Sequence, residues 1–308
     1  MATREQVEET YNYMDELFRL TYGEHGDCSG AMYDGDFTMS LEEAQGAKHR
    51  YILENLRISA GKRVLDIGCG WGPVLQAATR CGAHGVGLTL STKQAEACRR
   101  NGLEVYVRDW RDVGPESFGQ FDAAVSVGSF EHFCSDIEFR EGKQDEVYSR
   151  FMKLCHDVLR PGGRLFLQTM IWGKNAPRPE DISLKAPKAS NEYVVALLQM
   201  FYPGSWLPSG REQIERCAAP YFRLISVKNG RLDYIETMNQ WSRNSKFSFP
   251  KLLAAIKTLR YFFLDKDFYY KVKSLALNCN QECFKREIFD HQRMVFERID
   301  RPLNPVVT

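Results

Sequence analysis

Residues 64–72 read Val-Leu-Asp-Ile-Gly-Cys-Gly-Trp-Gly. The apolar run at 64–67 predicts a buried strand. The glycines at 68, 70 and 72 predict a tight turn, because glycine adopts backbone conformations that side chains disfavour. Pro73 follows the turn, and proline suits the first turn of a helix. A strand, a glycine turn and a helix in this order indicate an α/β sheet with a ligand at its carboxyl edge.

The same alternation of elements extends outward from this turn. Short apolar strands are predicted at 64–67, 85–89, 105–107, 123–127 and 164–171, and helices at 74–81, 91–101 and 145–159, with a turn at 161–163. Strands that alternate with helices favour parallel pairing, because each crossover helix returns the chain to the same edge. The predicted fold class is therefore α/β, a doubly wound, mostly parallel sheet of the Rossmann-like type.

The flanking regions predict a cap and a lid around this core. Residues 1–60 are predicted as an N-terminal helical cap, with an apolar stripe at Tyr11, Met14, Leu17 and Phe18 and with Ser40 capping a helix. Residues 61–172 form the ligand-binding core. Residues 173–308 are expected to add lid helices and the remaining strands, packed as one domain with the core. Within them, 191–201 is predicted as a helix, 224–238 as a return to the sheet and 241–298 as mostly helical.

Composition narrows the class of protein. The 308 residues are 44% hydrophobic, and 41 Lys and Arg against 40 Asp and Glu leave a net charge of +1, which gives no overall attraction to nucleic acid. Nine cysteines without a Cys-x-x-Cys pair indicate reduced thiols, and no metal site is predicted. The polar first residues and the lack of a long apolar run predict a cytoplasmic protein.

Polar groups at the predicted strand ends suggest which ligand binds. The glycine spacing is Gly-x-Gly-x-Gly, whereas dinucleotide sites use Gly-x-Gly-x-x-Gly. Hydroxyl and amide groups after the second strand suit a ribose, and Asp109 and Trp110 after the third suit an adenine, although Trp110 also fits a core position. These features predict S-adenosylmethionine (SAM) as the cofactor. The residues predicted to bind it are Ser29, Asp66, Gly68, Gly70, Gly72, Thr89, Leu90, Ser91, Gln94, Asp109, Trp110, Arg111, Val127 and Gly128.

Five stretches together resemble the cyclopropane-fatty-acid synthase and mycolic-acid methyltransferase family. They lie at residues 41–45, 65–72, 87–91, 125–133 and 202–209, and the last contains Tyr-Pro-Gly and Leu-Pro-Ser. The resemblance spans about residues 11–296. It implies a SAM-binding α/β domain with a helical lid, and unsaturated acyl chains as substrates. It also implies methyl transfer to an alkene carbon, which creates a carbocation that then loses a proton.

Such chemistry needs a carboxylate and an apolar, aromatic pocket. Glu131 matches the Glu of the family's Phe-Glu-His segment and is the main catalytic candidate, although it also suits a helix N-terminus; His132 is interpreted as structural. Tyr234 and Gln168 are the other catalytic candidates. The substrate pocket is predicted to contain Cys28, Phe130, Trp172, Phe201, Tyr202 and Trp206, although aromatic residues at helical spacing are more often core.

The chain departs from the family where a base is bound. Cyclopropane-forming members are expected to hold bicarbonate with a Cys, a Glu, a His and a Tyr. Here the pattern places the Cys near Gly30, whereas Cys28 lies two positions earlier, where loop slack would have to bring it in. Gln168 replaces the His, and residues 271–283 contain no Tyr, although Tyr269 and Tyr270 lie just upstream. Gln cannot act as a base near neutral pH. Simple C-methylation is therefore favoured over cyclopropane formation.

Two other functions stay open at this point. One is C- or N-methylation of a small specialised metabolite such as a terpenoid or an amine, and the other is SAM binding without catalysis. The expected partner is a lipid-like or small hydrophobic substrate, with no role for nucleic acid. A basic loop with Lys174, Arg178, Lys185 and Lys188 also suggests peripheral contact with a membrane or an acyl carrier. The oligomeric state is left open.

Overall fold

The computed structural model describes residues 22, 26–244, 263 and 265–302. The predicted apolar stripe at Tyr11, Met14, Leu17 and Phe18 lies outside these residues. Within the part of the chain that is described, no helix combines the length and the hydrophobicity needed to cross a bilayer.

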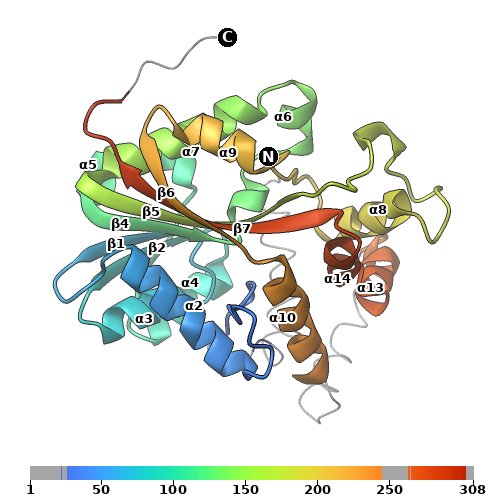
Figure 1. Ribbon diagram of the computed structural model, residues 1–308, viewed down its shortest axis with the longest axis horizontal. Helices are drawn as coiled ribbons and strands as arrows, with labels where there is room; N and C mark the ends of the chain where they lie inside the picture. Colours follow the sequence, from blue (N-terminus) through green and yellow to red (C-terminus); the bar gives the residue numbers. More distant parts are fainter. Residues whose placement is uncertain (1–21, 23–25, 245–262, 264, 303–308) are drawn as a thin grey trace.

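A seven-stranded sheet with the order β3-β2-β1-β4-β5-β7-β6 forms the centre of the molecule (Figure 1). The first five strands in this order run parallel, and β7 runs antiparallel to both β5 and β6. The strands are β1 Arg63–Ile67, β2 His84–Thr89, β3 Glu104–Val107, β4 Phe121–Val127, β5 Leu159–Trp172, β6 Phe222–Asn229 and β7 Phe289–Arg298. The predicted doubly wound, mostly parallel α/β fold is confirmed.

Helices cover both faces of the sheet and gather at one end of it (Figure 1). Helices α2 and α3 pack on one face, α7 and α9 on the other, and α8, α10, α13 and α14 lie together beyond the carboxyl ends of the parallel strands. The helices are α2 Leu41–Asn55, α3 Pro73–Arg80, α4 Thr92–Arg100, α5 Pro115–Phe118, α6 Asp136–Arg140, α7 Gln144–Val158, α8 Asn191–Phe201, α9 Arg211–Ala218, α10 Arg231–Asn244, α13 Phe268–Ala276 and α14 Cys279–Lys285. The strands β6 and β7 come from the region predicted as the lid, so the sheet joins that region to the core.

Local sequence signals explain where several helices begin. Ser40 caps α2 in a reciprocal capping box with Glu43, and Ser91 caps α4 by accepting a hydrogen bond from the Gln94 N–H. Both serines satisfy backbone donors that a helix N-terminus leaves unpaired. The helix predicted at 191–201 has the bounds of α8, Asn191–Phe201.

Three expectations are corrected. The return to the sheet at 224–238 ends at Asn229, and α10 begins at Arg231, so Tyr234 lies on a helix. The last part of 241–298, predicted as helical, forms β7; its buried polar residues Gln292 and Arg293 conceal the apolar pattern of a buried strand. Residues 161–163, predicted as a turn, lie inside β5 as an irregularity in its pairing with β4.

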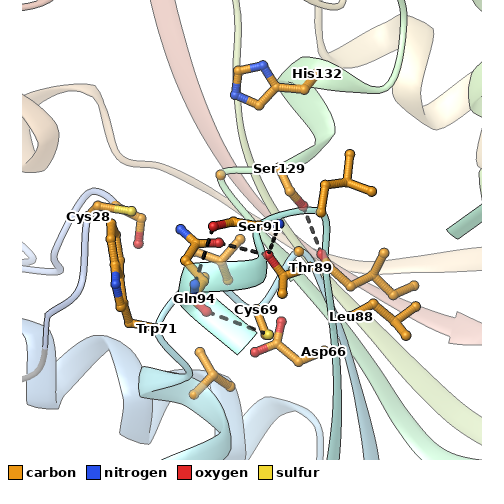
Figure 2. A pocket seen from close by; sticks show the side chains of 18 of the residues that line it. Cys28, Asp66, Cys69, Trp71, Leu88, Thr89, Ser91, Gln94, Ser129 and His132 are labelled. Carbon is orange, nitrogen blue, oxygen red and sulfur yellow. Dashed lines mark hydrogen bonds between the residues drawn. The ribbon is translucent and has the colours of Figure 1, made fainter. Parts of the chain in front are cut away.

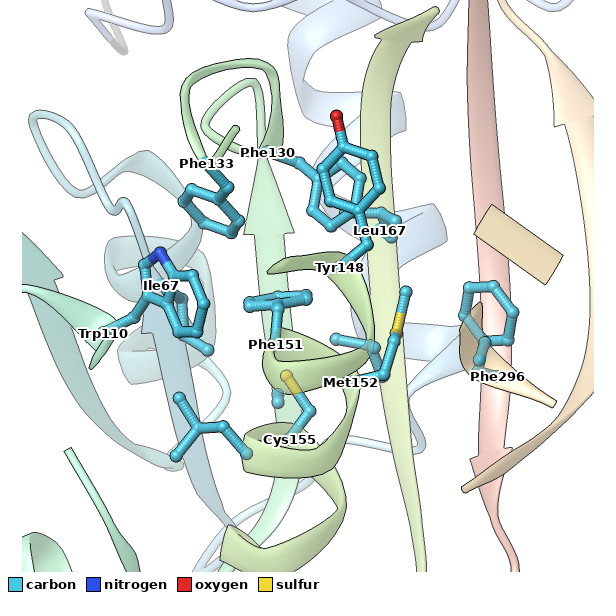
Figure 3. Close-up of a cluster of buried hydrophobic side chains, with 14 of the residues drawn as sticks. Ile67, Trp110, Phe130, Phe133, Tyr148, Phe151, Met152, Cys155, Leu167 and Phe296 are labelled. Carbon is cyan, nitrogen blue, oxygen red and sulfur yellow. The ribbon is translucent and has the colours of Figure 1, made fainter. Parts of the chain in front are cut away.

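The largest hydrophobic cluster lies between α7 and the sheet (Figure 3). Tyr148, Phe151, Met152 and Cys155 of α7 are completely buried at helical spacing and meet Phe130 from the loop after β4. Burial of each large apolar side chain contributes about 1.5–3 kcal/mol. This packing fixes the loop that carries Glu131, the residue next to Phe130.

Candidate active site

A first cavity of about 1030 Å³ opens at the carboxyl ends of β1, β2, β3 and β4 (Figure 2). This is the edge at which parallel α/β sheets bind ligands, as the glycine turn predicted. The predicted cofactor residues that line it are Ser29, Asp66, Gly68, Gly70, Thr89, Leu90, Ser91, Gln94, Asp109, Trp110, Val127 and Gly128.

The glycine turn shapes the floor of this cavity. Gly68, Gly70 and Gly72 all have a positive φ, at 84°, 55° and 77°. A Cβ on Gly68 would collide with the side chain of Ser129, whereas a Cβ on Gly70 would meet nothing within 4 Å. A Cβ on Gly72 would lie 2.6 Å from Leu103 Cδ1, and Gly72 does not line the cavity. Gly72 is therefore corrected from a cofactor contact to a packing position at the start of α3.

Asp66 presents an unsatisfied oxygen at this cavity. Its side chain is buried, and Oδ1 has no hydrogen-bond partner in the structure. Burial, together with the charge of Asp27, raises the pKa of Asp66 to about 8. A buried acceptor without a partner is costly. A bound ligand with hydrogen-bond donors would relieve that cost.

Polar side chains at the end of β2 are held by one another. The Thr89 hydroxyl donates to Gln94 Oε1 at 2.7 Å, and the Ser91 N–H donates to Thr89 Oγ1 at 3.1 Å. Because Ser91 also caps α4, these hydrogen bonds connect the start of the helix to the end of the strand. The cavity thus has a polar wall where the sequence predicted ribose contacts.

Two predicted cofactor contacts, Arg111 and Trp110, have structural roles. The Arg111 guanidinium donates to the Phe133 carbonyl at 2.8 Å and to Glu138 Oε1 at 3.1 Å, and Arg111 does not line the cavity. This placement corrects the prediction, because η1 (Trp110–Asp112) turns the side chain towards α6. Trp110 lines the cavity but also packs against Phe133 and Phe151, with ring centroids 5.2 and 5.6 Å away. Trp110 is therefore both a wall residue and part of the core.

The sequence did not predict a buried ion pair that lies beside the cavity. Lys48 is completely buried; its ammonium contacts Asp27 Oδ2 and donates to Ser29 Oγ at 2.6 Å. His49 Nε2 lies 2.9 Å from the same Asp27 oxygen. Although burial favours the neutral acid, Lys48 and His49 outweigh it and hold the pKa of Asp27 far below its ordinary range. A lysine and a histidine on the buried face of the helix capped by Ser40 were the signal that could have revealed it.

A second cavity of about 840 Å³ adjoins the first. Cys28, Ser29, Val127, Gly128 and His132 line both. The predicted residues that line the second cavity are Cys28, Glu131, Trp172, Tyr202 and Tyr234, and the apolar residues around them include Met170, Val195, Leu198, Leu207 and Phe289. The structure thus brings these distant residues together, with Glu131 near the junction with the cofactor cavity.

Glu131 places a buried carboxylate in the second cavity. Its side chain is 2% exposed, Oε1 accepts the Met170 N–H at 2.8 Å, and Oε2 has no partner. Burial raises the pKa of Glu131 to about 7, against the opposing effect of the Met170 N–H. The neighbouring His132 ring contacts Ser205 Oγ through Nδ1 at 2.8 Å, and burial lowers its pKa to about 4. His132 is therefore neutral near pH 7, and Glu131 is the group that titrates there.

Four predicted catalytic or pocket residues line neither cavity. Phe130 stacks on Tyr148 at 4.5 Å in the core, and Trp206 stacks on Phe139 at 4.3 Å. Phe201 packs in a separate cluster with Tyr22 and Trp71. These three are corrected to packing roles, because their helices and loops turn them away from the site.

Gln168 is the fourth. Its Nε2 donates to the Gly30 carbonyl at 2.9 Å, and its Oε1 accepts from Arg293 Nε at 3.2 Å. Arg293 in turn donates to Asp233 at 2.7 Å and to the Ala31 carbonyl at 2.6 Å. With both ends of its amide engaged and no surface in either cavity, Gln168 is corrected from a catalytic to a supporting residue.

The residues present do not fit the bicarbonate that the family resemblance implies. A Cβ on Gly30 would lie 3.1 Å from Tyr234 Cγ and 3.4 Å from His291 Cε1, so two rings already fill the space of a cysteine side chain. Gln168, in place of the histidine, is tied to Gly30 and Arg293. Glu131 and Tyr234 do line the second cavity. A carboxylate and a phenol do not make the set of donors that an anion needs.

Comparison with known proteins identifies the family. The family model described as mycolic acid cyclopropane synthetase matches residues 1–285. The chain belongs to this family. Among curated members, cyclopropane mycolic acid synthase 2 of Mycobacterium leprae (strain TN) is 30% identical over 249 residues, 77% of this chain and 78% of the relative. Cyclopropane mycolic acid synthase 3 of Mycobacterium tuberculosis (strain CDC 1551 / Oshkosh) is 31% identical over 244 residues, 77% of this chain and 80% of the relative.

The protein shares its fold with a family member whose structure has been solved. The structure of mycolic acid cyclopropane synthase CmaA1 complexed with SAH and CTAB has a TM-score of 0.73 and 26% identity, and the match covers 96% of this chain and 98% of that one. As a family member, the chain is a SAM-dependent methyltransferase with S-adenosylmethionine as its cofactor. The first cavity suits that cofactor, since it offers a glycine cradle and the unpaired Asp66 oxygen.

Proposed function

We propose that this enzyme methylates an alkene carbon of an unsaturated, lipid-like acyl chain and releases a methyl-branched product rather than a cyclopropane. The observation that carries the proposal is Glu131, a buried carboxylate with one free oxygen, in an apolar cavity that adjoins the cofactor cavity. An alkene offers no lone pair, so its methylation creates a cation. A carboxylate in a dry cavity can stabilise such a cation.

In this proposal, one set of residues binds the cofactor and a second set stabilises the cation. The glycine turn, Asp66 and the Thr89–Ser91–Gln94 wall hold the cofactor, which supplies an electrophilic methyl group when bound. Trp172, Tyr202 and Tyr234 line the second cavity, and an aromatic face turned towards a cation can stabilise it by about 0.5–2 kcal/mol. Glu131 Oε2 then accepts the proton that a chain carbon releases as the alkene re-forms.

The missing bicarbonate set supports a branched product. Ring closure requires a base that removes a proton from the newly added methyl group. The supports for such an anion are absent, because Gly30 carries no side chain and Gln168 is hydrogen-bonded elsewhere. Glu131 is then the proton acceptor that the second cavity offers.

The charged groups around the second cavity favour an uncharged acyl chain as the substrate. None of its lining residues, all within the described part of the chain, is a lysine or an arginine, and Glu131 carries the negative charge. A free carboxylate or a diphosphate would therefore be repelled from this cavity. An esterified acyl chain carries no charge along its length and fits this environment.

The same carboxylate and aromatic rings favour one alternative, N-methylation of a small amine. A protonated amine would pair with Glu131 and lie against Tyr202 or Trp172. The enzyme must release that proton before the nitrogen can react, and Glu131, with a pKa of about 7, could accept it. This function remains the second candidate.

Product analysis separates these functions. The enzyme is incubated with methyl-labelled SAM and either monounsaturated phospholipids or a panel of secondary and tertiary amines, and products are identified by mass spectrometry and NMR. We expect a labelled methyl branch on the acyl chain and no label in the amines. A labelled cyclopropane would overturn the branched product, and label confined to amines would establish the alternative.

A further inference from the structure

The second cavity contains polar atoms that methyl transfer to a plain alkene does not use. Trp172 Nε1 and Asn280 Oδ1 are buried, and neither has a hydrogen-bond partner in the structure. Both residues line the second cavity. Neither lines the cofactor cavity, so the cofactor cannot satisfy them.

The two atoms lie in apolar surroundings. Trp172 ends β5, where its ring lies 5.2 Å from those of Phe289 and Trp206. Asn280 belongs to α14, whose residues Cys283 and Phe284 pack in one hydrophobic cluster with Phe289 and Trp172. Apolar neighbours cannot replace the hydrogen bonds that water would give these atoms, so leaving them unpaired costs stability.

The chemistry of the pair points to its partner. An indole N–H only donates, and an amide oxygen only accepts. A hydroxyl on a substrate can do both, whereas an ester or thioester carbonyl can only accept. An ammonium could satisfy Asn280 but would leave Trp172 unpaired.

We propose that the substrate of the second cavity is a hydroxylated unsaturated chain, whose hydroxyl accepts from Trp172 Nε1 and donates to Asn280 Oδ1. This inference rests on the proposed function and narrows its substrate class. The hydroxyl would fix how far the chain enters the cavity. Its position would thus select which alkene carbon lies opposite Glu131, since misplacement of the reacting atoms is costly in rate.

Binding of inert analogues tests the proposal without turnover. The probes are decan-1-ol, which donates and accepts, decyl methyl ether, which only accepts, and decane, which does neither. Dissociation constants are measured by calorimetry or tryptophan fluorescence for the wild type, Trp172→Phe and Asn280→Leu. Ratios between probes are compared across proteins, so that differences in the solubility of the probes cancel.

We expect each hydrogen bond to contribute about a three- to tenfold preference. Trp172→Phe should remove the preference for the ether over decane, and Asn280→Leu the preference for the alcohol over the ether. Trp206→Phe is the matched control, because Trp206 lines neither cavity. SAM affinity reports whether each variant is folded.

Two results would overturn the inference. One is that both variants bind SAM normally yet keep the probe ratios of the wild type. The other is that the wild type does not distinguish the three probes. A failure to methylate any alkene, with the probe ratios as expected, would instead reject the proposed reaction and leave the hydroxyl site standing.

Discussion

Glu131 shows how burial raises the pKa of a carboxylate. It is 2% exposed and gains one backbone hydrogen bond, so the loss of solvation outweighs the stabilisation that the Met170 N–H provides. The resulting pKa of about 7 suits the proton transfer that we propose for this group near neutral pH. A carboxylate in water could not be tuned in this way.

The first prediction concerns activity and pH. Because the proposed mechanism requires the carboxylate form of Glu131, kcat should rise with pH and level off above about 7. Glu131→Gln should lower kcat by about 100-fold or more without changing SAM affinity. Methyl-transfer assays from pH 5.5 to 8.5 check this expectation. A variant that keeps wild-type kcat would remove Glu131 from the mechanism.

The second prediction concerns stability. The contribution of Glu131 to the free energy of unfolding should fall with rising pH, whereas kcat should rise. The folded state keeps the proton of Glu131 up to about pH 7, whereas an unfolded glutamate releases it near 4.5. The contribution of Glu131 to the free energy of unfolding is therefore fully present below pH 4.5 and falls as pH rises. At 1.36 kcal/mol per pH unit, the loss is about 3 kcal/mol by pH 7. Urea unfolding should show Glu131→Gln gaining stability relative to the wild type between pH 5 and 8.

At the scale of elements, the three glycines in the turn between β1 and α3 serve two purposes: close packing and room for a ligand. Gly68 is required because Ser129 occupies the space of a side chain, and Gly72 because Leu103 packs against it. Gly70 has open space around it and lines the cavity. Gly68 also lines the cavity, but only at Gly70 is the space of a Cβ left open for a ligand.

The third prediction compares two of these glycines. Gly68→Ala should abolish SAM binding or folding, since a positive φ and a steric clash act together. Gly70→Ala faces only the cost of its positive φ, about 1 kcal/mol, and should fold. Thermal unfolding and SAM titration of both variants provide the measurement. An equal loss of thermal stability in the two proteins would contradict the clash with Ser129; SAM affinity can fall in both, since both glycines line the cofactor cavity.

The fourth prediction concerns the start of α2, the helix that carries Lys48. Ser40→Ala removes the capping box with Glu43 and should lower the free energy of unfolding by about 1 kcal/mol. Since the cap is at the surface, SAM affinity should change little. If the affinity falls as far as the stability, the position of Lys48 depends on the cap.

At the scale of the whole molecule, a buried network joins segments that are far apart in the sequence, around Ala31 and Arg293. Arg293 of β7 is completely buried and holds Asp233 of α10, Gln168 of β5 and the Ala31 carbonyl. These partners lie between 60 and 262 residues away in sequence. Arg293 thereby anchors Ala31, close in sequence to Cys28 and Ser29, which line both cavities.

The fifth prediction tests this network. Arg293→Met leaves the Asp233 carboxylate buried without its partner and should destabilise the fold by about 3–5 kcal/mol. The double variant Arg293→Met, Asp233→Asn removes both charges and should recover part of that loss. Urea unfolding of the single and double variants measures the coupling. Additive effects would show that the two side chains act independently.

The sequence alone determined the parallel α/β sheet, the glycine turn and most residues of the cofactor cavity. Strands and turns depend on neighbouring residues, and parallel strands necessarily meet at one edge. The same local reasoning placed Glu131 correctly in a cavity, because it follows β4 directly.

Only the tertiary structure decided the roles of Gln168, Arg111, Phe130 and Trp206, and it alone revealed the pairing of Lys48 with Asp27. Each of these side chains could face a cavity or a packed neighbour with the same local sequence. Its direction is set by partners far along the chain, such as Arg293 for Gln168. Hydrogen bonding and packing between distant segments, which no short stretch of sequence encodes, therefore determine the substrate side of the site.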